Sequence, residues 1–217
     1  MIETLGKTQQ NLLHALQAHK SGLTMDTLAD VLHITRTAVR QHIAALEIQG
    51  FVEKGQTYSS GGRPSQFYQL THKGFDLFPK QYALFSTFLL DAINSEKGND
   101  GLSDWLHQLG NQVAQNFKHK TIDDTLQGRL IKTVNVMNTL AYDAYVDENQ
   151  SKQDEGAIEA VNCIYHDLAA RHPQVCQFDL ALLANLTDSK VIHKKCIQKG
   201  DSVCRFCFIA TPSNSNV

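Results

Sequence analysis

The stretch "TMDTLADVLHITRTAVRQHIAALEIQGFVEK", residues 24–54, decides the fold of the N-terminal third. Thr24 and Thr35 are good N-cap residues, and Asp26 in the first turn after Thr24 favours the helix dipole. Apolar residues follow each cap at helical spacing: Leu28, Val31 and Leu32 after the first, and Ala38, Val39, Ile43 and Leu46 after the second. The pattern predicts two short helices and a tight turn, the layout of a helix-turn-helix.

The second of these helices leaves polar side chains facing outward in its N-terminal half. Arg and Gln side chains at such positions can reach base edges in the major groove of DNA, and Thr and His side chains can hold phosphates. The candidate DNA-contacting residues are Thr35, Arg36, Thr37, Arg40, Gln41 and His42. The alternative is that these residues form only the solvated side of an amphipathic helix.

Two short strand patterns follow, "GFVEK" (50–54) and "QFYQLT" (66–71), with "GQTYSSGGRP" between them. A two-stranded hairpin after a helix-turn-helix is a wing, although a Gly-Gly-Arg-Pro loop is elsewhere an ordinary turn. Arg63 at the wing tip is expected at or near the minor groove and the DNA backbone, and Ser65 joins it as a DNA-contacting candidate. Residues 1–74 are therefore predicted to form a winged helix-turn-helix domain that binds a double-stranded DNA operator.

Charge is unevenly divided along a chain whose formal net charge is -2. Residues 1–80 carry 8 Lys and Arg against 6 Asp and Glu, and the remaining residues carry 12 against 16. The N-terminal part is thus mildly basic, which permits a nucleic-acid-binding face there without demonstrating one.

The middle of the chain, residues 75–138, is predicted to be a helical linker. Large apolar residues crowd its first part, too many for a free-standing surface helix, and Pro79 is expected to start a new helix. Two more helical patterns follow, "GLSDWLHQLGNQVAQNF" and "IDDTLQGRLIKTVNVMNTL". The apolar faces form either an intramolecular core or the interface of a homodimer, which helix-turn-helix proteins commonly need to bind paired half-sites.

Residues 139–217 alternate strand and helix patterns, which predicts an α+β domain containing all five cysteines. The predicted fold class of the whole chain is therefore mostly α with α+β. Cys163 is expected to close a strand, Cys176 to open a helix and Cys204 to start the last strand, so that three element ends can converge. Widely spaced thiolates suit an iron–sulfur cluster, whereas zinc sites usually show paired Cys knuckles. Cys207 would alternate away from the face that bears Cys204, which fits a buried small hydrophobe, the commoner role of a single cysteine.

The segments "NCIYHDLAARHPQVCQFDLALLANL" and "CIQKGDSVCRFCF" together resemble the C-terminal half of the Suf-operon repressor (SufR-like) family. The family pattern is close to Asn-Cys-(Pro)…Cys-x-x-(Asp/Glu)…Gly-Asp-x-x-Cys-x-Phe, and Cys163, Cys176 and Cys204 match its cysteines. Ile164 stands where family members often have proline. The winged-helix part is similar to the same family, so the resemblance covers roughly residues 8–210.

The resemblance implies a homodimeric DNA-binding repressor with an oxygen- or redox-sensitive cluster, typically 4Fe-4S. The regulated genes would be iron–sulfur assembly genes or redox- and iron-response genes. Cys163, Cys176 and Cys204 would be three of its ligands. The fourth is left open among Cys196, which the strand-face pattern favours, Cys207, His166, His193 and an exogenous small molecule. A 2Fe-2S cluster, structural zinc and a thiol-oxidation switch are the alternative forms of the sensor.

A metal-dependent or thiol-redox enzyme is a more distant alternative. The sequence has no Gly-rich nucleotide loop, nucleophile elbow or His-Glu-x-x-His motif, so we expect no enzymatic activity. No apolar run approaches the roughly 20 residues of a membrane span. The start "MIETLGKTQQ" lacks the order of a signal peptide. We therefore expect a cytoplasmic protein without membrane contacts.

Overall fold

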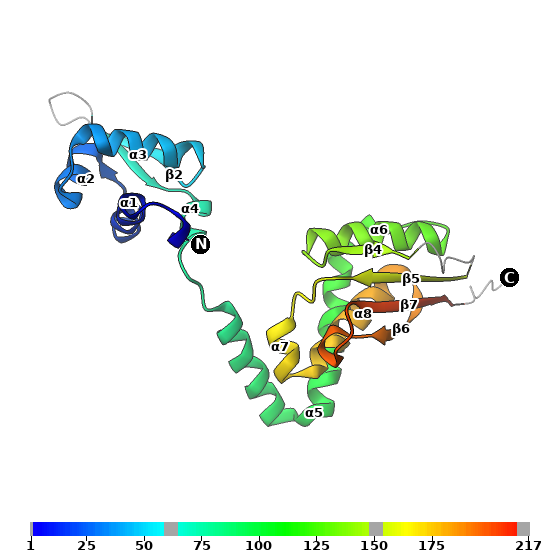
Figure 1. Cartoon of the computed structure of the whole chain (residues 1–217). Coiled ribbons are helices and arrows are strands. Elements are labelled where there is room, and N and C mark those ends of the chain that lie inside the picture. Colours follow the sequence, from blue (N-terminus) through cyan, green and yellow to red (C-terminus); the bar gives the residue numbers. More distant parts are fainter. Residues whose placement is uncertain (1, 59–64, 148–153, 212–217) are drawn as a thin grey trace. The chain divides into compact units, whose positions relative to one another are not determined.

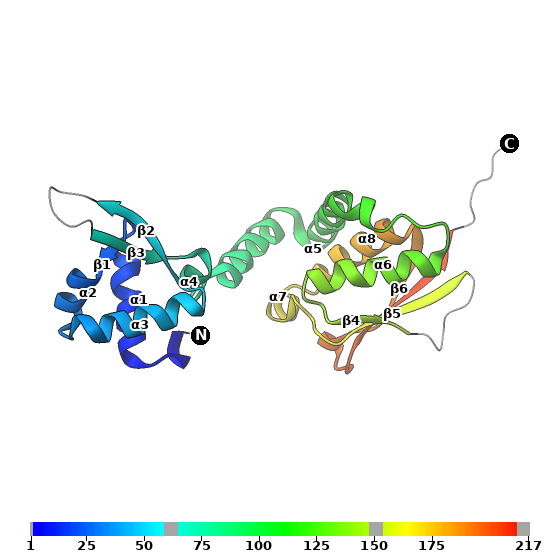
Figure 2. The same ribbon diagram turned by 90° about the horizontal axis from the view of Figure 1, so that it is seen from above.

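The computed structural model describes residues 2–58, 65–147 and 154–211, and the chain divides into two compact units, Met1–Gln81 and Tyr82–Val217 (Figures 1 and 2). The fold is mostly helical with one antiparallel sheet in each unit, which confirms the predicted class. The division differs from the three predicted regions, because helices between residues 82 and 139 pack with the C-terminal sheet. Every helix in the described ranges is too short or too polar to cross a membrane.

The N-terminal unit contains the predicted helix-turn-helix and the two predicted hairpin strands, together with further short elements. Its elements are η1 (Ile2–Thr4), α1 (Lys7–Ala18), β1 (Leu23–Thr24), α2 (Met25–Leu32), α3 (Arg36–Ile48), β2 (Val52–Tyr58), β3 (Ser65–Leu70) and α4 (His72–Asp76). Both predicted caps form: Thr24 Oγ1 accepts from the Thr27 N–H at 3.1 Å, and Thr35 Oγ1 accepts from the Ala38 N–H at 3.2 Å. His33, in the left-handed region with φ 53°, ends α2 and makes the turn tight.

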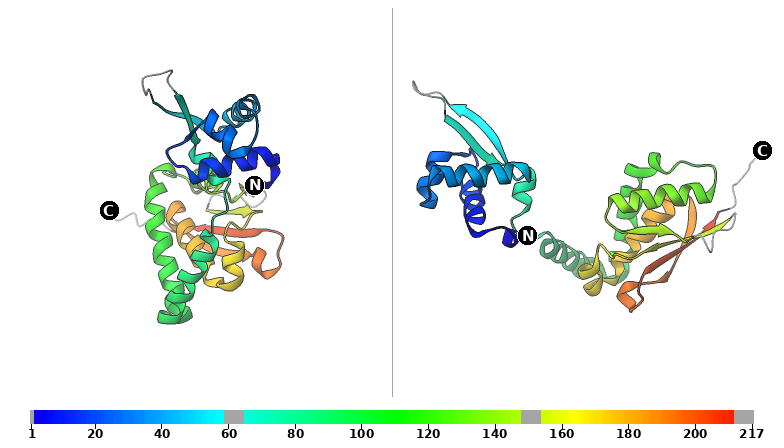
Figure 3. Two further views of the ribbon diagram at one scale, coloured as in Figure 1. Left: turned by 90° about the vertical axis from the view of Figure 1, so that its left-hand side faces the viewer. Right: turned by 45° about the horizontal axis from the view of Figure 1, so that its top comes forward.

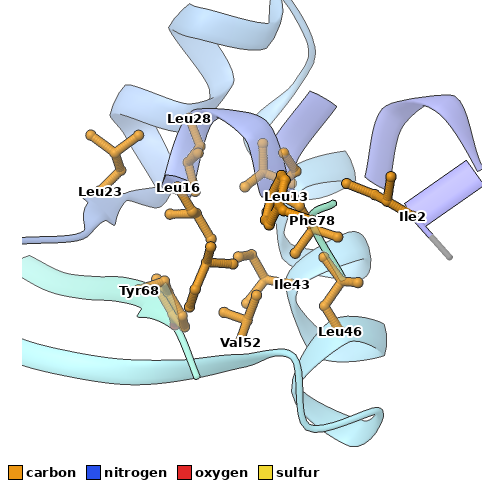
Figure 4. Close-up of a cluster of buried hydrophobic side chains, with 13 residues drawn as sticks. Ile2, Leu13, Leu16, Leu23, Leu28, Ile43, Leu46, Val52, Tyr68 and Phe78 are labelled. Atoms are coloured by element: carbon orange, nitrogen blue, oxygen red, sulfur yellow. The ribbon is translucent and has the colours of Figure 1, made fainter. Parts of the chain in front are cut away.

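The three strands of this unit form an antiparallel sheet in the order β1-β3-β2. Gly22 permits the close approach to β3, because its φ is +86° and a Cβ there would lie 2.6 Å from the Tyr68 carbonyl oxygen. Figure 4 shows apolar side chains of the helices and strands meeting in one core. Its most buried members are Leu12, Leu13, Leu16, Leu28, Val39, Ile43 and Leu46.

The C-terminal unit is an antiparallel sheet in the order β4-β5-β7-β6 with helices on one face (Figures 2 and 3). Its elements are α5 (Tyr82–Phe117), η2 (Lys118–Lys120), α6 (Leu126–Thr139), β4 (Ala144–Val146), β5 (Glu155–Ala160), α7 (His166–Arg171), η4 (Pro173–Val175), α8 (Cys176–Thr187), β6 (Ser189–Lys195), η5 (Ile197–Lys199) and β7 (Cys204–Ala210). Leu130 of α6 and Leu183 of α8 share a core with Ile158, Phe206 and Phe208 of the sheet.

Helix α5 forms the outer layer and consists of two helical segments that meet at Gly98, whose φ of +69° interrupts the helix. The sequence predicts two separate helical patterns in this range, and the first begins at Tyr82 in the structure rather than at Pro79. The second segment packs closely on α8. A Cβ at Gly110 would lie 2.4 Å from the Phe178 carbonyl oxygen and 2.9 Å from the Ala181 Cβ, so only glycine permits this approach without a shift.

Candidate metal centre and nucleic-acid interface

Cysteines from separate elements converge at one end of the C-terminal sheet. Cys163 lies in the loop after β5, Cys176 is the first residue of α8, Cys196 follows β6 directly, and Cys204 is the first residue of β7. The thiols of Cys163, Cys176 and Cys204 each interact electrostatically with that of Cys196. We call these four residues the thiol cluster. Cys176 and Cys204 begin their elements as predicted, whereas β5 ends at Ala160, before Cys163.

The loop between β6 and β7 holds Cys196 in place. Asp201 Oδ2 accepts a hydrogen bond from the Cys196 N–H at 2.7 Å. The Cys196 carbonyl oxygen in turn accepts from the N–H groups of Lys199 and Asp201, at 2.9 and 3.2 Å. Gly200, with φ +95°, lets the chain reverse here. The backbone around Cys196 is therefore fixed on both sides by hydrogen bonds.

A second set of contacts ties this loop to α7. Gln198 Nε2 donates to the His166 carbonyl oxygen at 2.7 Å and lies 2.9 Å from His166 Nδ1. His166, one of the candidates for a fourth ligand, is exposed and already has this partner.

Cys207, the other candidate thiol, lies on the opposite face of the sheet. It pairs with Ala157 of β5 and Ile192 of β6, while Cys204 and Phe206 point to the helical side. The structure thus brings Cys196 to the other three cysteines and keeps Cys207 away from them.

One histidine joins the thiol cluster. A ring nitrogen of His193 and the Sγ atoms of Cys176 and Cys196 all lie within 4.8 Å of one another. His193 Nε2 is buried and has no hydrogen-bond partner within the described residues. Its ring stacks on Phe206, with centroids 4.6 Å apart and planes 15° from parallel.

Burial raises the pKa of several thiols in the cluster. Loss of solvent, followed by the nearby Cys196 thiol, raises the pKa of Cys176 to about 12. Loss of solvent also raises the pKa of Cys204 to about 11, and it raises the pKa of Cys163. Backbone hydrogen bonds from Tyr165 to Cys163 and from Ile197 to Cys204 oppose this effect. Metal ligation needs the thiolate, so the protein alone disfavours the ligating form and a bound cation would favour it.

A buried carboxyl group lies near the thiols and was not among the predicted site residues. Asp179 stands one turn after Cys176 on α8 and accepts a hydrogen bond from Tyr142 Oη at 2.5 Å. Loss of solvent raises the pKa of Asp179 to about 7, against the opposing effect of the Tyr142 bond. Asp179 and Asp201 both occur in the family's cysteine pattern, as Cys-x-x-Asp and Gly-Asp. Their place in that pattern is the sequence signal that could have identified them as site residues.

The candidate nucleic-acid interface is the N-terminal half of α3 together with the start of β3. Thr35, Arg36, Thr37, Arg40 and Gln41 are exposed there, as predicted, and His42 is half-buried. Arg36 Nε lies 2.9 Å from Asp26 Oδ1 in an ion pair that is open to solvent, so a phosphate can replace the carboxylate at little cost. Arg63 lies outside the described residues.

Ser65 and Arg36 line the same surface concavity of about 370 Å³, with Tyr68 and the start of α2. The wing and α3 therefore present their polar side chains to one space.

Residues 8–55 match the HTH domain family (HTH_11). Three solved structures share partial similarity. The PcaV transcriptional regulator from Streptomyces coelicolor is 25% identical, with 35% of this chain and 51% of that chain covered and a TM-score of 0.31. A mutant of S. aureus MepR bound to an oligodeoxyribonucleotide is 15% identical, with 64% of this chain and 80% of that chain covered and a TM-score of 0.30. A MarR family transcriptional regulator from Silicibacter pomeroyi is 20% identical, with 52% of this chain and 74% of that chain covered and a TM-score of 0.30.

This chain spans about half the length of the PcaV chain. A comparison with curated proteins finds no match. The matching family is described as an HTH domain, and the structures from Streptomyces coelicolor and Silicibacter pomeroyi are described as transcriptional regulators. With the caps, helices and hairpin strands described above, the N-terminal unit is a DNA-binding domain of the winged helix-turn-helix type.

Proposed function

We propose that this protein is a homodimeric transcriptional repressor whose affinity for its DNA operator depends on an iron–sulfur cluster. Cys163, Cys176, Cys196 and Cys204 would hold the cluster. The observation that carries the proposal is the convergence of these thiols from separate elements at one end of the sheet. Iron–sulfur clusters are large and are commonly held by four cysteine thiolates.

The surroundings of the thiols fit such a group. Two of them receive backbone N–H hydrogen bonds, which are among the interactions that tune iron–sulfur clusters. Cys176 lies in the first turn of α8, where the helix dipole favours a thiolate. When bound, the cluster would supply one-electron redox chemistry and sensitivity to oxygen, and the four sulfurs would tie the β6–β7 hairpin to α8 and to the loop before α7.

Cluster loss would loosen these elements, because metal-site formation is also folding free energy for the segments that it joins. Helix α8 packs on α5, so the loosening would reach the helix that follows the DNA-binding unit in the chain. The sequence resemblance supports iron–sulfur assembly genes as the regulated set and repression as the effect.

The first segment of α5 supports the homodimer. Its exposed apolar side chains are Tyr82, Leu84, Phe85, Phe88 and Leu89, with exposed fractions of 72, 48, 62, 59 and 47%. Leu89 also lines an apolar groove of about 330 Å³. Contiguous exposed apolar surface of this kind marks an interaction site, and a second copy would present the recognition helix for a paired half-site.

The test begins with iron and acid-labile sulfide per chain on protein purified without oxygen. We expect about four of each, for a cluster of the 4Fe-4S type that four thiolates hold. Cys204→Ser should lose the cluster, and Cys207→Ser, on the other face of the same strand, should keep it. An operator is then selected from random double-stranded DNA with the cluster-bound protein, and its affinity is compared after cluster removal.

Two results would contradict the proposal. One is an unchanged iron content in Cys204→Ser, and the other is operator affinity that is the same with and without the cluster. Zinc without sulfide would instead favour the structural-zinc form of the regulator.

A further inference from the structure

The proposed cluster needs four ligands, yet a fifth donor stands among the thiols. His193 and Cys196 come from the end of β6 and Cys176 from α8, and their three donor atoms lie within 4.8 Å of one another. Bonds of about 2.3 Å to sulfur and 2.1 Å to nitrogen put the ligand atoms of a tetrahedral zinc ion about 3.5–3.8 Å apart. The trio is therefore compact enough to close on a single ion with small side-chain movements.

The imidazole has an unused ligand atom. His193 Nε2 is buried and finds no hydrogen-bond partner in the described part of the chain. Buried nitrogen atoms are normally paired, because an unpaired one loses its bonds to water and gains nothing in return. Nε2 is therefore the ring nitrogen that we assign to an ion held with the two sulfurs, since such an ion would supply the missing partner.

The ring is also held as metal-binding imidazoles usually are. It stacks on Phe206 with centroids 4.6 Å apart, and it hydrogen-bonds to the backbone of Lys195. A ligating histidine almost always uses its second nitrogen on a backbone carbonyl or carboxylate, which fixes the orientation of the first. The direction of the ring is thus set before any ion arrives.

An ion can reach the trio from solvent. All three residues line a cavity of about 420 Å³, whose rim carries the exposed side chains of Lys194 and Lys199. Each thiol releases its proton to water on binding, so a divalent ion with two thiolates and a neutral imidazole is electrically neutral. The positive charges of the two lysines therefore do not repel the site once the ion is bound.

We propose that Cys176, Cys196 and His193 bind a single divalent ion of the Zn²⁺ type, and that this ion and the iron–sulfur cluster exclude each other. Exclusion follows because both occupants need Cys176 and Cys196. The mutual exclusion rests on the proposed function, whereas the site for a single ion does not depend on the proposed function. The site would make the regulator respond to zinc as well as to the supply of clusters.

The experiment uses Co²⁺ alone as the probe, added to the metal-free full chain without oxygen. We expect one Co²⁺ per chain, with the intense visible bands of a tetrahedral ion and thiolate-to-cobalt charge transfer, and displacement by Zn²⁺. His193→Gln should weaken binding by more than the about 10–100-fold that the loss of an outer partner costs. His119→Gln, at an exposed position of η2 in the same unit, is the matched control and should bind as the unaltered protein does. Equal affinity and an unchanged spectrum in His193→Gln would overturn the site.

A measurement on the unaltered chain covers the case in which His193→Gln does not fold. The ¹⁵N resonance of His193 Nε2 should move on addition of Zn²⁺, and a resonance that stays in place contradicts ligation. For exclusion, chains loaded with Zn²⁺ should take up less iron and sulfide in proportion to the zinc bound. Full uptake with zinc retained would refute exclusion. If no chain takes up a cluster, the proposed function fails while the cobalt and ¹⁵N results still decide the site.

Discussion

A methyl group added at Gly110 tests the packing of α5 on α8. In Gly110→Ala the new carbon would stand 2.4 Å from the Phe178 carbonyl oxygen and 3.2 Å from the Leu182 nitrogen, so backbone atoms of α8 must move. Overpacking costs about 1–3 kcal/mol, and we expect the upper part of that range, about 2–3 kcal/mol, because backbone atoms must give way. Alanine returns about 1 kcal/mol through its better helix propensity. We expect a net loss of about 1–2 kcal/mol in the free energy of unfolding.

The measurement is urea unfolding followed by tryptophan fluorescence. The single tryptophan of the chain, Trp105, lies on α5, so its fluorescence reports the unfolding of this helix. With a slope of about 2 kcal/mol/M, the midpoint should fall by about 0.5–1 M. Gln108→Ala, at an exposed position of the same helix, is the control and should leave the midpoint nearly unchanged. A midpoint for Gly110→Ala equal to or above that of the unaltered chain would refute the close contact between the two helices.

The other predictions concern the two sites and the exposed helix. Arg40→Ala should weaken specific operator binding by about 1–3 kcal/mol if Arg40 reads a base, as measured by fluorescence anisotropy. Asp201→Ala removes the acceptor of the Cys196 N–H and should speed the loss of iron in air, followed by visible absorbance. Phe88→Glu places a charge on the exposed apolar face and should give monomers in sedimentation, with weaker operator binding.

Each of these changes has a control on the same element or unit. Gln49→Ala at the far end of α3 should leave operator affinity unchanged, and Asp167→Ala on α7 should leave the rate of iron loss unchanged. Lys97→Glu, which adds a charge elsewhere on α5, should remain dimeric. An effect of equal size in a control would count against the corresponding prediction.

The helix-turn-helix was predictable because its signals are local. Thr24 and Thr35 mark the helix starts, and the apolar residues after them recur at helical spacing, so each helix is specified by its own residues. Strand alternation likewise assigns Cys204 and Cys207 to opposite faces from their spacing alone. These features depend on residues near one another in the chain.

The packing of the middle helices and the geometry of the candidate metal site could not be predicted, because they depend on contacts between segments that are distant in the chain. The predicted linker packs with the C-terminal sheet because α6 covers that sheet and α5 meets α8 at Gly110, and helical periodicity does not say which partner an apolar face will find. The approach of a ring nitrogen of His193 to the two thiols exists only once β6 and α8 lie together. The pairing of Asp179 with Tyr142 spans 37 residues and has no local signature.

Helix α8 has Cys176 as its first residue and the Phe178 carbonyl oxygen against Gly110 two residues later. No flexible side chain lies between the two helices at this point, so a movement of α8 here would press directly on the backbone of α5. Leu90 before the Gly98 break and Leu106 after it both pack in the same cluster as Val175, the residue preceding Cys176. A displacement of α8 at Cys176 would therefore act on both halves of α5, the helix that follows the DNA-binding unit in the chain.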